Sequence, residues 1–132
     1  NLISVPTDGW NGYMGYTFLN CTSLNQEINI TNANTLIQTF KGCTSLSITP
    51  SIETDPTVTN VSMDNCFEDC SSLIMPPITP NNVKSMGYTY KRCTNLEVAP
   101  NIPSDVIYMA YMLSNCKKIK EFCNIFYSYE SI

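Results

Sequence analysis

Seven cysteines are the residues of this 132-residue chain with the widest chemical range, because a cysteine sulfur can form a disulfide, bind a metal or act as a nucleophile. Five of them stand at regular intervals: the steps from Cys21 to Cys43, Cys70, Cys93 and Cys116 are 22, 27, 23 and 23 residues. Five equivalent positions cannot all pair, and the total is odd. A bridge between neighbouring positions stays an alternative where the geometry allows it. Because free cysteine packs well as a small hydrophobe, the spacing favours a reduced, buried column of thiols.

Metal binding and catalysis lack their usual residues. The chain has no histidine and no Cys-x-x-Cys, and Cys66 with Cys70 is a close pair without a second one beside it. Without histidine, the common base for a serine or cysteine nucleophile is missing. The carboxylates fall at repeat positions that we expect to be exposed, so they indicate a solvated surface: Asp55, Asp64, Glu68, Asp69 and Glu97. We therefore expect no catalytic residue, no metal and no cofactor.

Large apolar residues recur in register with the cysteines, which identifies the chain as a run of about five tandem repeats. Three columns form a predicted core ladder, at three residues before each Cys, at the Cys itself and at three residues after it: Phe18, Cys21 and Leu24; Phe40, Cys43 and Leu46; Phe67, Cys70 and Leu73; Tyr90, Cys93 and Leu96; Leu113, Cys116 and Ile119. A fourth column, seven residues before each Cys, holds Met14, Leu36, Met63, Met86 and Met109.

The repeats predict one solenoid over residues 1–132, in which no repeat can bury its apolar face alone. About four extra residues in the long step lie within residues 53–60, a Pro/Thr-rich stretch that is typical of a loop. The phase of Leu2 and Pro6 matches mid-repeat positions elsewhere, so we expect an internal stretch of a longer array. The predicted units are a partial repeat at 1–13, followed by 14–35, 36–62, 63–85, 86–108 and 109–132.

Each repeat divides into two predicted elements. Met86, Tyr90, Cys93 and Leu96 are spaced by 4, 3 and 3 residues, which predicts a short helix or 3₁₀ turn with one apolar stripe. Residues 96–100 alternate between apolar and other positions, which predicts a short strand ending at a proline. The predicted fold class is thus an α/β repeat coil, with parallel strands on one face and helical segments on the other.

The repeat pattern of this chain resembles that of a known family. The stretches 39–46 and 90–103 are similar to the bacterial surface leucine-rich repeats of the BspA-like type, in the variant with Met and Pro in the repeat. The resemblance covers nearly all of the chain, except that Ile28 and Cys123 replace the proline found seven residues after Cys in the middle repeats. It implies a right-handed leucine-rich-repeat solenoid without catalytic residues. It also implies adhesion or protein binding at a cell surface.

Composition narrows the classes of partner. The net charge of −4 argues against nucleic acid and against polybasic attachment to anionic lipid. The longest apolar run, residues 106–113, has 8 residues, whereas a membrane span needs about 20. A protein or glycan partner is the remaining expectation. We also consider contacts with neighbouring repeats or subunits of a larger assembly.

Two surfaces are candidates for that partner. Aromatic residues flank the Met column and are candidate exposed binding anchors, although packing between the predicted helical segments is the favoured interpretation: Trp10, Tyr13, Tyr16, Tyr88, Tyr108 and Tyr111. The predicted strands also present outward positions, among them Ser47, Thr49 and Glu97. The first hypothesis is therefore an extracellular or cell-surface binding module. The alternative is a structural spacer or decoration element of a larger assembly, such as a phage fibre or virion.

Overall fold

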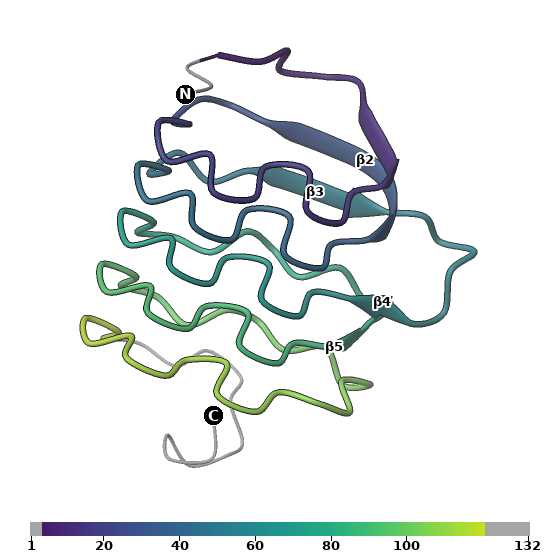
Figure 1. Cartoon of the computed structure of the whole chain (residues 1–132). Helices are drawn as coiled ribbons and strands as arrows, with labels where there is room; N and C mark the ends of the chain where they lie inside the picture. Colours follow the sequence, from purple (N-terminus) through teal and green to yellow (C-terminus); the bar gives the residue numbers. More distant parts are fainter. Residues whose placement is uncertain (1–3, 121–132) are drawn as a thin grey trace.

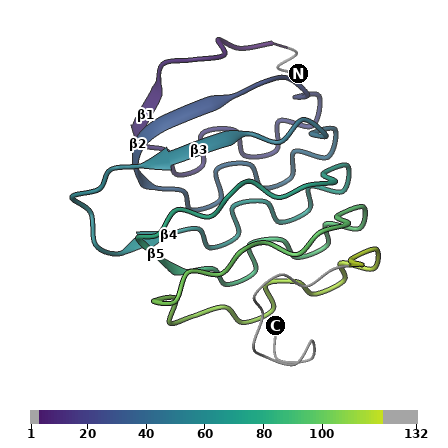
Figure 2. The same cartoon turned by 180° about the vertical axis from the view of Figure 1, so that it is seen from behind.

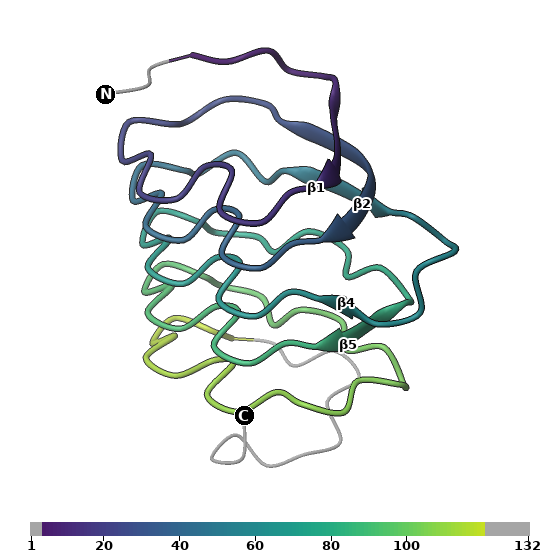
Figure 3. The same ribbon diagram turned by 45° about the vertical axis from the view of Figure 1, so that its right-hand side comes forward.

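The computed structural model describes residues 4–120, so Leu2, Phe122 and Cys123 lie outside the described residues. The chain winds through stacked layers, which we call rungs (Figure 1). Figure 3 shows the rungs lying one below another, each with a wavy side and a more extended side. We number them by the repeats that form them: rung 1, 14–35; rung 2, 36–62; rung 3, 63–85; rung 4, 86–108; and rung 5, 109–120.

The extended side of the stack carries short parallel strands, as predicted. Figure 2 shows the first three of them side by side. They form two sheets, in the orders β1-β2-β3 and β4-β5, and Trp10, Ile30 and Ile52 are in register across the first sheet. An isolated bridge between Ser85 and Tyr108 continues the second sheet. The strands are β1 (Trp10–Tyr13), β2 (Asn29–Thr35), β3 (Ser51–Thr54), β4 (Val61–Ser62) and β5 (Val83–Ser85).

The strands lie at a different point of the repeat from the one predicted. β1, β2, β4 and β5 each end at the residue just before the Met column, and residues 96–100 form no strand. The prediction for 96–100 was wrong because a ladder needs a donor at every second residue of both neighbours. The equivalent residues of rung 3 are Pro76 and Pro77, and neither has an N–H to give. Between the two rungs at this point, Glu97 N–H still donates to Ile74 O at 2.9 Å, and on the other side of the segment Lys120 N–H donates to Glu97 O at 3.0 Å.

The predicted helical segments are also wrong, because residues 4–120 contain no helix. Each wavy side has two residues in the left-handed region, which a helix excludes; in rung 1 they are Tyr16 (φ 62°) and Asn20 (φ 58°). Alternate amides then point to the next rung instead of along a helix axis. Phe18 N–H donates to Thr39 O at 2.8 Å, while Cys21 N–H donates to Phe18 O at 3.0 Å within the rung. The described chain accordingly has no helix long or apolar enough to cross a bilayer.

A ladder of stacked rings runs through the core. Phe18, Phe40, Phe67 and Tyr90 lie in successive rungs, with centroids 5.2, 5.2 and 5.4 Å apart and interplanar angles of 14°, 5° and 3°. The spacing is close to the distance between hydrogen-bonded strands, so backbone pairing and ring stacking are satisfied together. Trp10 meets Phe18 edge-on at 4.8 Å, at the N-terminal end of this ladder.

The cysteine column lies beside the rings. The Cys43 thiol donates to Phe18 O at 3.1 Å, and the thiols of Cys70, Cys93 and Cys116 make the same bond, each at 3.0 Å, to the aromatic residue of the preceding rung. Cys43, Cys70 and Cys93 are fully buried. A thiol therefore serves here as a small apolar side chain that also satisfies a buried carbonyl.

Among the six cysteines of residues 4–120, labelling of the native protein with a thiol reagent at about pH 8 is expected to modify Cys21 first, because it is half-buried and the reactive species is the thiolate. Burial raises the pKa of Cys43 and of Cys116 to about 12, so their thiolates are rare. Burial also raises the pKa of the Cys66 thiol. Mass spectrometry with and without urea follows each site. Cys21→Ser should remove the fast reaction, whereas rapid labelling of Cys70 in the native protein would contradict the buried column.

Candidate functional site

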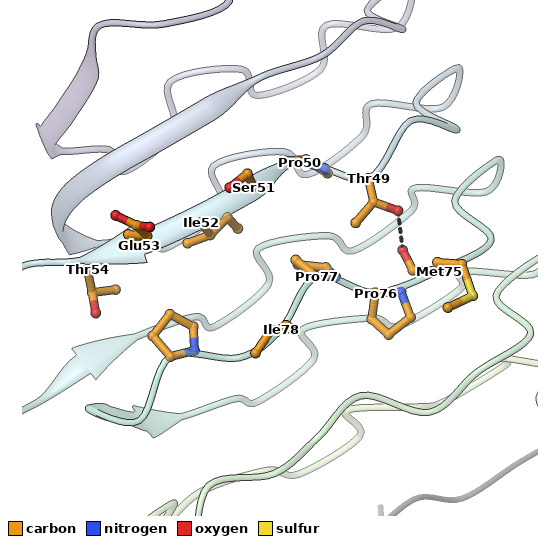
Figure 4. A pocket seen from close by; sticks show the side chains of 11 residues that line it. Thr49, Pro50, Ser51, Ile52, Glu53, Thr54, Met75, Pro76, Pro77 and Ile78 are labelled. Atoms are coloured by element: carbon orange, nitrogen blue, oxygen red, sulfur yellow. Dashed lines mark hydrogen bonds between the residues drawn. The ribbon is translucent and has the colours of Figure 1, made fainter.

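An opening interrupts the extended side of the stack between rungs 2 and 3. It lies between β3 and residues 75–80, has a volume of about 740 Å³, and is shown in Figure 4. The volume is in the range of ligand-binding clefts. The lining is mostly apolar and is contributed by both rungs: Thr49, Pro50, Ser51, Ile52, Glu53 and Thr54 from rung 2, and Met75, Pro76, Pro77, Ile78 and Pro80 from rung 3.

Proline chemistry explains why the sheet opens at this point. Pro80 stands ten residues after its cysteine (80 − 70), as Glu53 does in rung 2 (53 − 43). On β3, Ser51 N–H donates to Ile28 O at 3.0 Å, and the alternation of a parallel ladder turns the amide of Glu53 toward β2 as well. Pro80 has no such amide. Within residues 4–120, no backbone hydrogen bond joins β3 to residues 75–80, so β3 is an edge strand.

Side-chain hydrogen bonds close both ends of the opening. At one end, Thr49 Oγ1 donates to Met75 O at 2.8 Å (Figure 4). At the other end, Thr54 Oγ1 donates to Asn82 Oδ1 at 2.5 Å. Asn82 Nδ2 in turn donates to Asp55 O and Val58 O, at 2.9 and 2.7 Å, and so ties down the inserted loop. The opening therefore has a fixed length, since four residues, 50–53, lie between the two threonines that close it.

The opening combines free main-chain groups with apolar walls. Because Ser51 and Glu53 turn their backbone groups toward β2, the N–H and C=O of Ile52 face the other way, toward rung 3. The wall across from them includes Ile78, which is 82% exposed, and Met75, which is 48% exposed. Glu53 is the one charged residue of the lining. This arrangement can bind a partly apolar polypeptide, and it presents no acid–base pair.

Three of the predicted aromatic residues form a second surface, the tyrosine cluster of Tyr88, Tyr108 and Tyr111. The rings of Tyr88 and Tyr111 stack with centroids 5.3 Å apart. Tyr108 lies over Gly87, where an added Cβ would come within 2.1 Å of its ring. Lys91 Nζ lies 5.3 Å from the centre of the Tyr88 ring. Tyr108 and Tyr111 are exposed, and Tyr88 is half-buried.

The other predicted aromatic residues lie at the opposite end of the stack. Tyr13 and Tyr16 are exposed, whereas Trp10 packs on Phe18 and donates Nε1–H to Pro6 O at 2.8 Å. Rungs 2 and 3 separate them from the tyrosine cluster. Those rungs carry the polar residues Gln38 and Asn65 at the positions of Tyr16 and Tyr88. The six predicted aromatic residues therefore do not form one surface.

The predicted strand-face residues also separate. Thr49 lines the opening, but Ser47 Oγ donates to Asn25 Oδ1 at 3.1 Å in the preceding rung. Glu97 lies in a smaller pocket of about 240 Å³ beside Lys118. Sequence reasoning did not single out the rung 3 wall of the opening, residues 75–80. The sequence feature that could have indicated this wall is the presence of three prolines in a mainly apolar segment, because prolines interrupt the hydrogen bonds between strands.

A chain of ion pairs crosses rungs 2, 3 and 4. Lys41 Nζ lies 3.0 Å from Glu68 Oε2, and Arg92 Nη2 lies 2.9 Å from Glu68 Oε1 and also pairs with Asp69. Glu68 is 5% exposed, so its predicted exposure was wrong. Opposite charges of neighbouring rungs meet there, because Lys41 and Glu68 both stand two residues before a Cys, and Asp69 and Arg92 both stand one residue before. Opposite charges at equivalent positions of neighbouring repeats could therefore have indicated these ion pairs from the sequence.

The pKa values of both carboxyl groups follow from these contacts. Burial disfavours the charged form of Glu68, but hydrogen bonds from Asn65 and Lys41 outweigh it and lower its pKa below the ordinary value of 4.5. A hydrogen bond from Arg92 lowers the pKa of Asp69 despite partial burial. Both groups are therefore charged at neutral pH, and their ion pairs link three rungs.

Comparison of the chain with models of protein families, with curated proteins and with solved structures finds no match. Function is therefore inferred from the residues themselves. In residues 4–120, no three Cys, Asp or Glu side chains lie close enough together to hold a metal ion. Within the described residues, the opening combines a cleft, exposed apolar side chains and an edge strand.

Proposed function

We propose that this chain is a non-catalytic protein-binding module of an extracellular or cell-surface repeat protein. The fold we propose is a right-handed solenoid of the leucine-rich-repeat kind. The opening between β3 and residues 75–80 is the proposed docking site. The observation that carries the proposal is that an edge strand borders an apolar cleft, in which Ile78 is 82% exposed. Edge strands and exposed apolar patches are features that proteins use for docking.

The stacked core supports this role. Rings and thiols repeat through rungs 1–4 at nearly constant spacing, so the opening is held on a rigid frame. The same unbroken ladder favours the alternative, a structural spacer of a larger assembly such as a virion. A spacer needs no cleft, and the two functions therefore differ in what the opening does.

Selection of short linear peptides displayed on phage, against the full chain, tests the binding function. We expect enriched peptides whose affinity falls about tenfold or more in Ile78→Ser, because the exposed side chain supplies much of the apolar wall. Ile78 is so exposed that its replacement should leave stability within about 0.5 kcal/mol. Tyr111→Ser, in the tyrosine cluster, is the matched control and should bind normally.

Two results would contradict the proposed site. The first is that no peptide is enriched, which would favour a spacer. The second is that enriched peptides lose affinity in Tyr111→Ser and keep it in Ile78→Ser. The tyrosine cluster would then be the binding surface.

A further inference from the structure

We propose, on the basis of the proposed function, that the opening binds a short extended segment of a partner protein. This segment adds to the free edge of β3 as a strand. The expected segment is free of proline, carries an aliphatic side chain at its centre and is neutral or basic. This binding mode and this partner chemistry go beyond the docking site proposed above.

The main chain provides the first argument. Ile52 turns its N–H and C=O toward the opening, and the residue that would pair with its C=O in rung 3 is Pro80. An extended segment placed between the two rungs can donate to the Ile52 carbonyl and accept from the Ile52 amide. It thereby supplies the hydrogen bonds that rung 3 cannot form. Strand addition of this kind derives affinity from main-chain bonds, so a donor N–H, and hence a residue other than proline, is required.

The walls select the side chains of the segment. Met75, Pro76, Pro77 and Ile78 offer an apolar surface with no charge. Because successive residues of a strand point to opposite sides, one aliphatic side chain can pack against this surface while its neighbours point to solvent. Burial of an aliphatic side chain is favourable in proportion to the apolar area removed from water.

Charge provides the third argument. Glu53 is the one charged residue in the lining, and the whole chain carries a net charge of −4. An acidic segment would be repelled, whereas Lys or Arg beside the buried position would be attracted. Because Glu53 is exposed, the effect is modest and weakens with salt.

The closed ends limit the length of the segment. The bonds from Thr49 to Met75 and from Thr54 to Asn82 bound the opening at both ends. A long strand cannot pass through in line with β3. The bound part must therefore be no longer than the four residues, 50–53, between these two bonds, and both of its ends must leave outward, as in an extended loop of the partner.

The probe for this mode is the capped tetrapeptide Lys-Ile-Lys-Val, titrated into the ¹⁵N-labelled full chain. We expect the amide resonances of Ile52 and Ile78 to shift. Methylation of the central peptide nitrogen, which removes one donor, should weaken binding about tenfold. The peptide Glu-Ile-Glu-Val should bind about threefold more weakly at low salt, and Glu53→Gln should remove that difference. Tyr111→Ser is again the control and should leave all shifts unchanged.

The outcomes separate this inference from the proposed function. If phage-selected peptides bind at Ile78 but N-methylation and charge reversal of the probe have no effect, strand addition is wrong and the docking site stands. If the probe leaves the Ile52 and Ile78 amides unshifted, strand addition is likewise overturned. If no selected peptide binds either, the proposed function fails as well.

Discussion

Phe67→Ala is expected to lower the free energy of unfolding by about 3–5 kcal/mol, the largest effect of any single change considered for this chain. Phe67 is fully buried and is stacked between Phe40 at 5.2 Å and Tyr90 at 5.4 Å. Truncation removes the ring from the middle of the ladder and leaves a cavity between rungs that the backbone bonds hold at fixed spacing. Two stacked contacts are lost at once. Urea unfolding followed by circular dichroism measures the change.

A matched control separates packing from general sensitivity to substitution. Ile107→Ala removes a similar side chain that is 86% exposed, and its effect should stay within about 0.5 kcal/mol. Because folded domains are only about 5–15 kcal/mol more stable than their unfolded state, Phe67→Ala could leave little folded protein. Phe67→Leu then gives a smaller loss that stays measurable. Equal effects of Phe67→Leu and Ile107→Ala would show that the ring ladder does not stabilise the stack.

Glu68→Gln is expected to cost about 1–3 kcal/mol at neutral pH, which is the usual worth of a hydrogen bond to a charged group. The substitution keeps the size of the side chain but removes the charge shared by Lys41 and Arg92. The cost stays below that of a fully buried broken pair, because the Lys41 and Arg92 side chains are 31% and 42% exposed and keep part of their hydration. Glu97→Gln is the control, since Glu97 is partly exposed and lies 3.8 Å from Lys120.

The effect of Glu68→Gln should depend on pH with a definite sign. The pKa of Glu68 is lowered in the folded protein. Near the ordinary pKa, the folded state therefore binds fewer protons than the unfolded state. The stabilisation is therefore present above the ordinary pKa and is lost as the pH falls through the lowered value. The difference in unfolding free energy between wild type and variant should shrink between about pH 5 and pH 3. A difference that stays constant over that range would contradict the ion-pair role.

These two changes act on the frame rather than on the opening. Phe67 and Glu68 both lie in rung 3, whose extended side forms one wall of the opening. Loss of the frame should therefore weaken peptide binding together with stability, whereas Ile78→Ser should weaken binding alone. Comparing both readouts in each variant distinguishes a residue that contacts the peptide from one that holds the wall.

The columns of the repeat were readable from the sequence because each rung meets its neighbours through equivalent residues. A large apolar residue that recurs at Phe18, Phe40, Phe67 and Tyr90 must stack if rungs stack at all. The thiol column follows from the same regularity, and its hydrogen bonds to carbonyls explain why sulfur occupies it. A comparison of charged residues at equivalent positions of the repeats, like the one made for apolar residues, would also have predicted the pairing of Lys41 with Glu68.

The backbone conformation within a rung was decided by tertiary structure. The spacing of Met14, Phe18 and Cys21 fits a helix and a series of turns equally well. The choice depends on whether the amide of Phe18 finds its acceptor within its own segment or at Thr39, in the next rung. Left-handed residues such as Tyr16 and Asn20 are tolerated because those bonds between rungs compensate for them. A local pattern carries no information about an acceptor more than twenty residues away.

The regular spacing of the cysteines thus specified a stack of rungs, its core columns and the register between rungs. The reason is that, in a stack of repeats, each residue lies next to the equivalent residue of the following repeat. The opening beside β3 could not be specified in this way. Ile52 and Pro80 line it from neighbouring rungs, and Pro80 has no amide to donate to β3. A missing hydrogen bond belongs to two strands at once, and only the folded chain brings those two strands together.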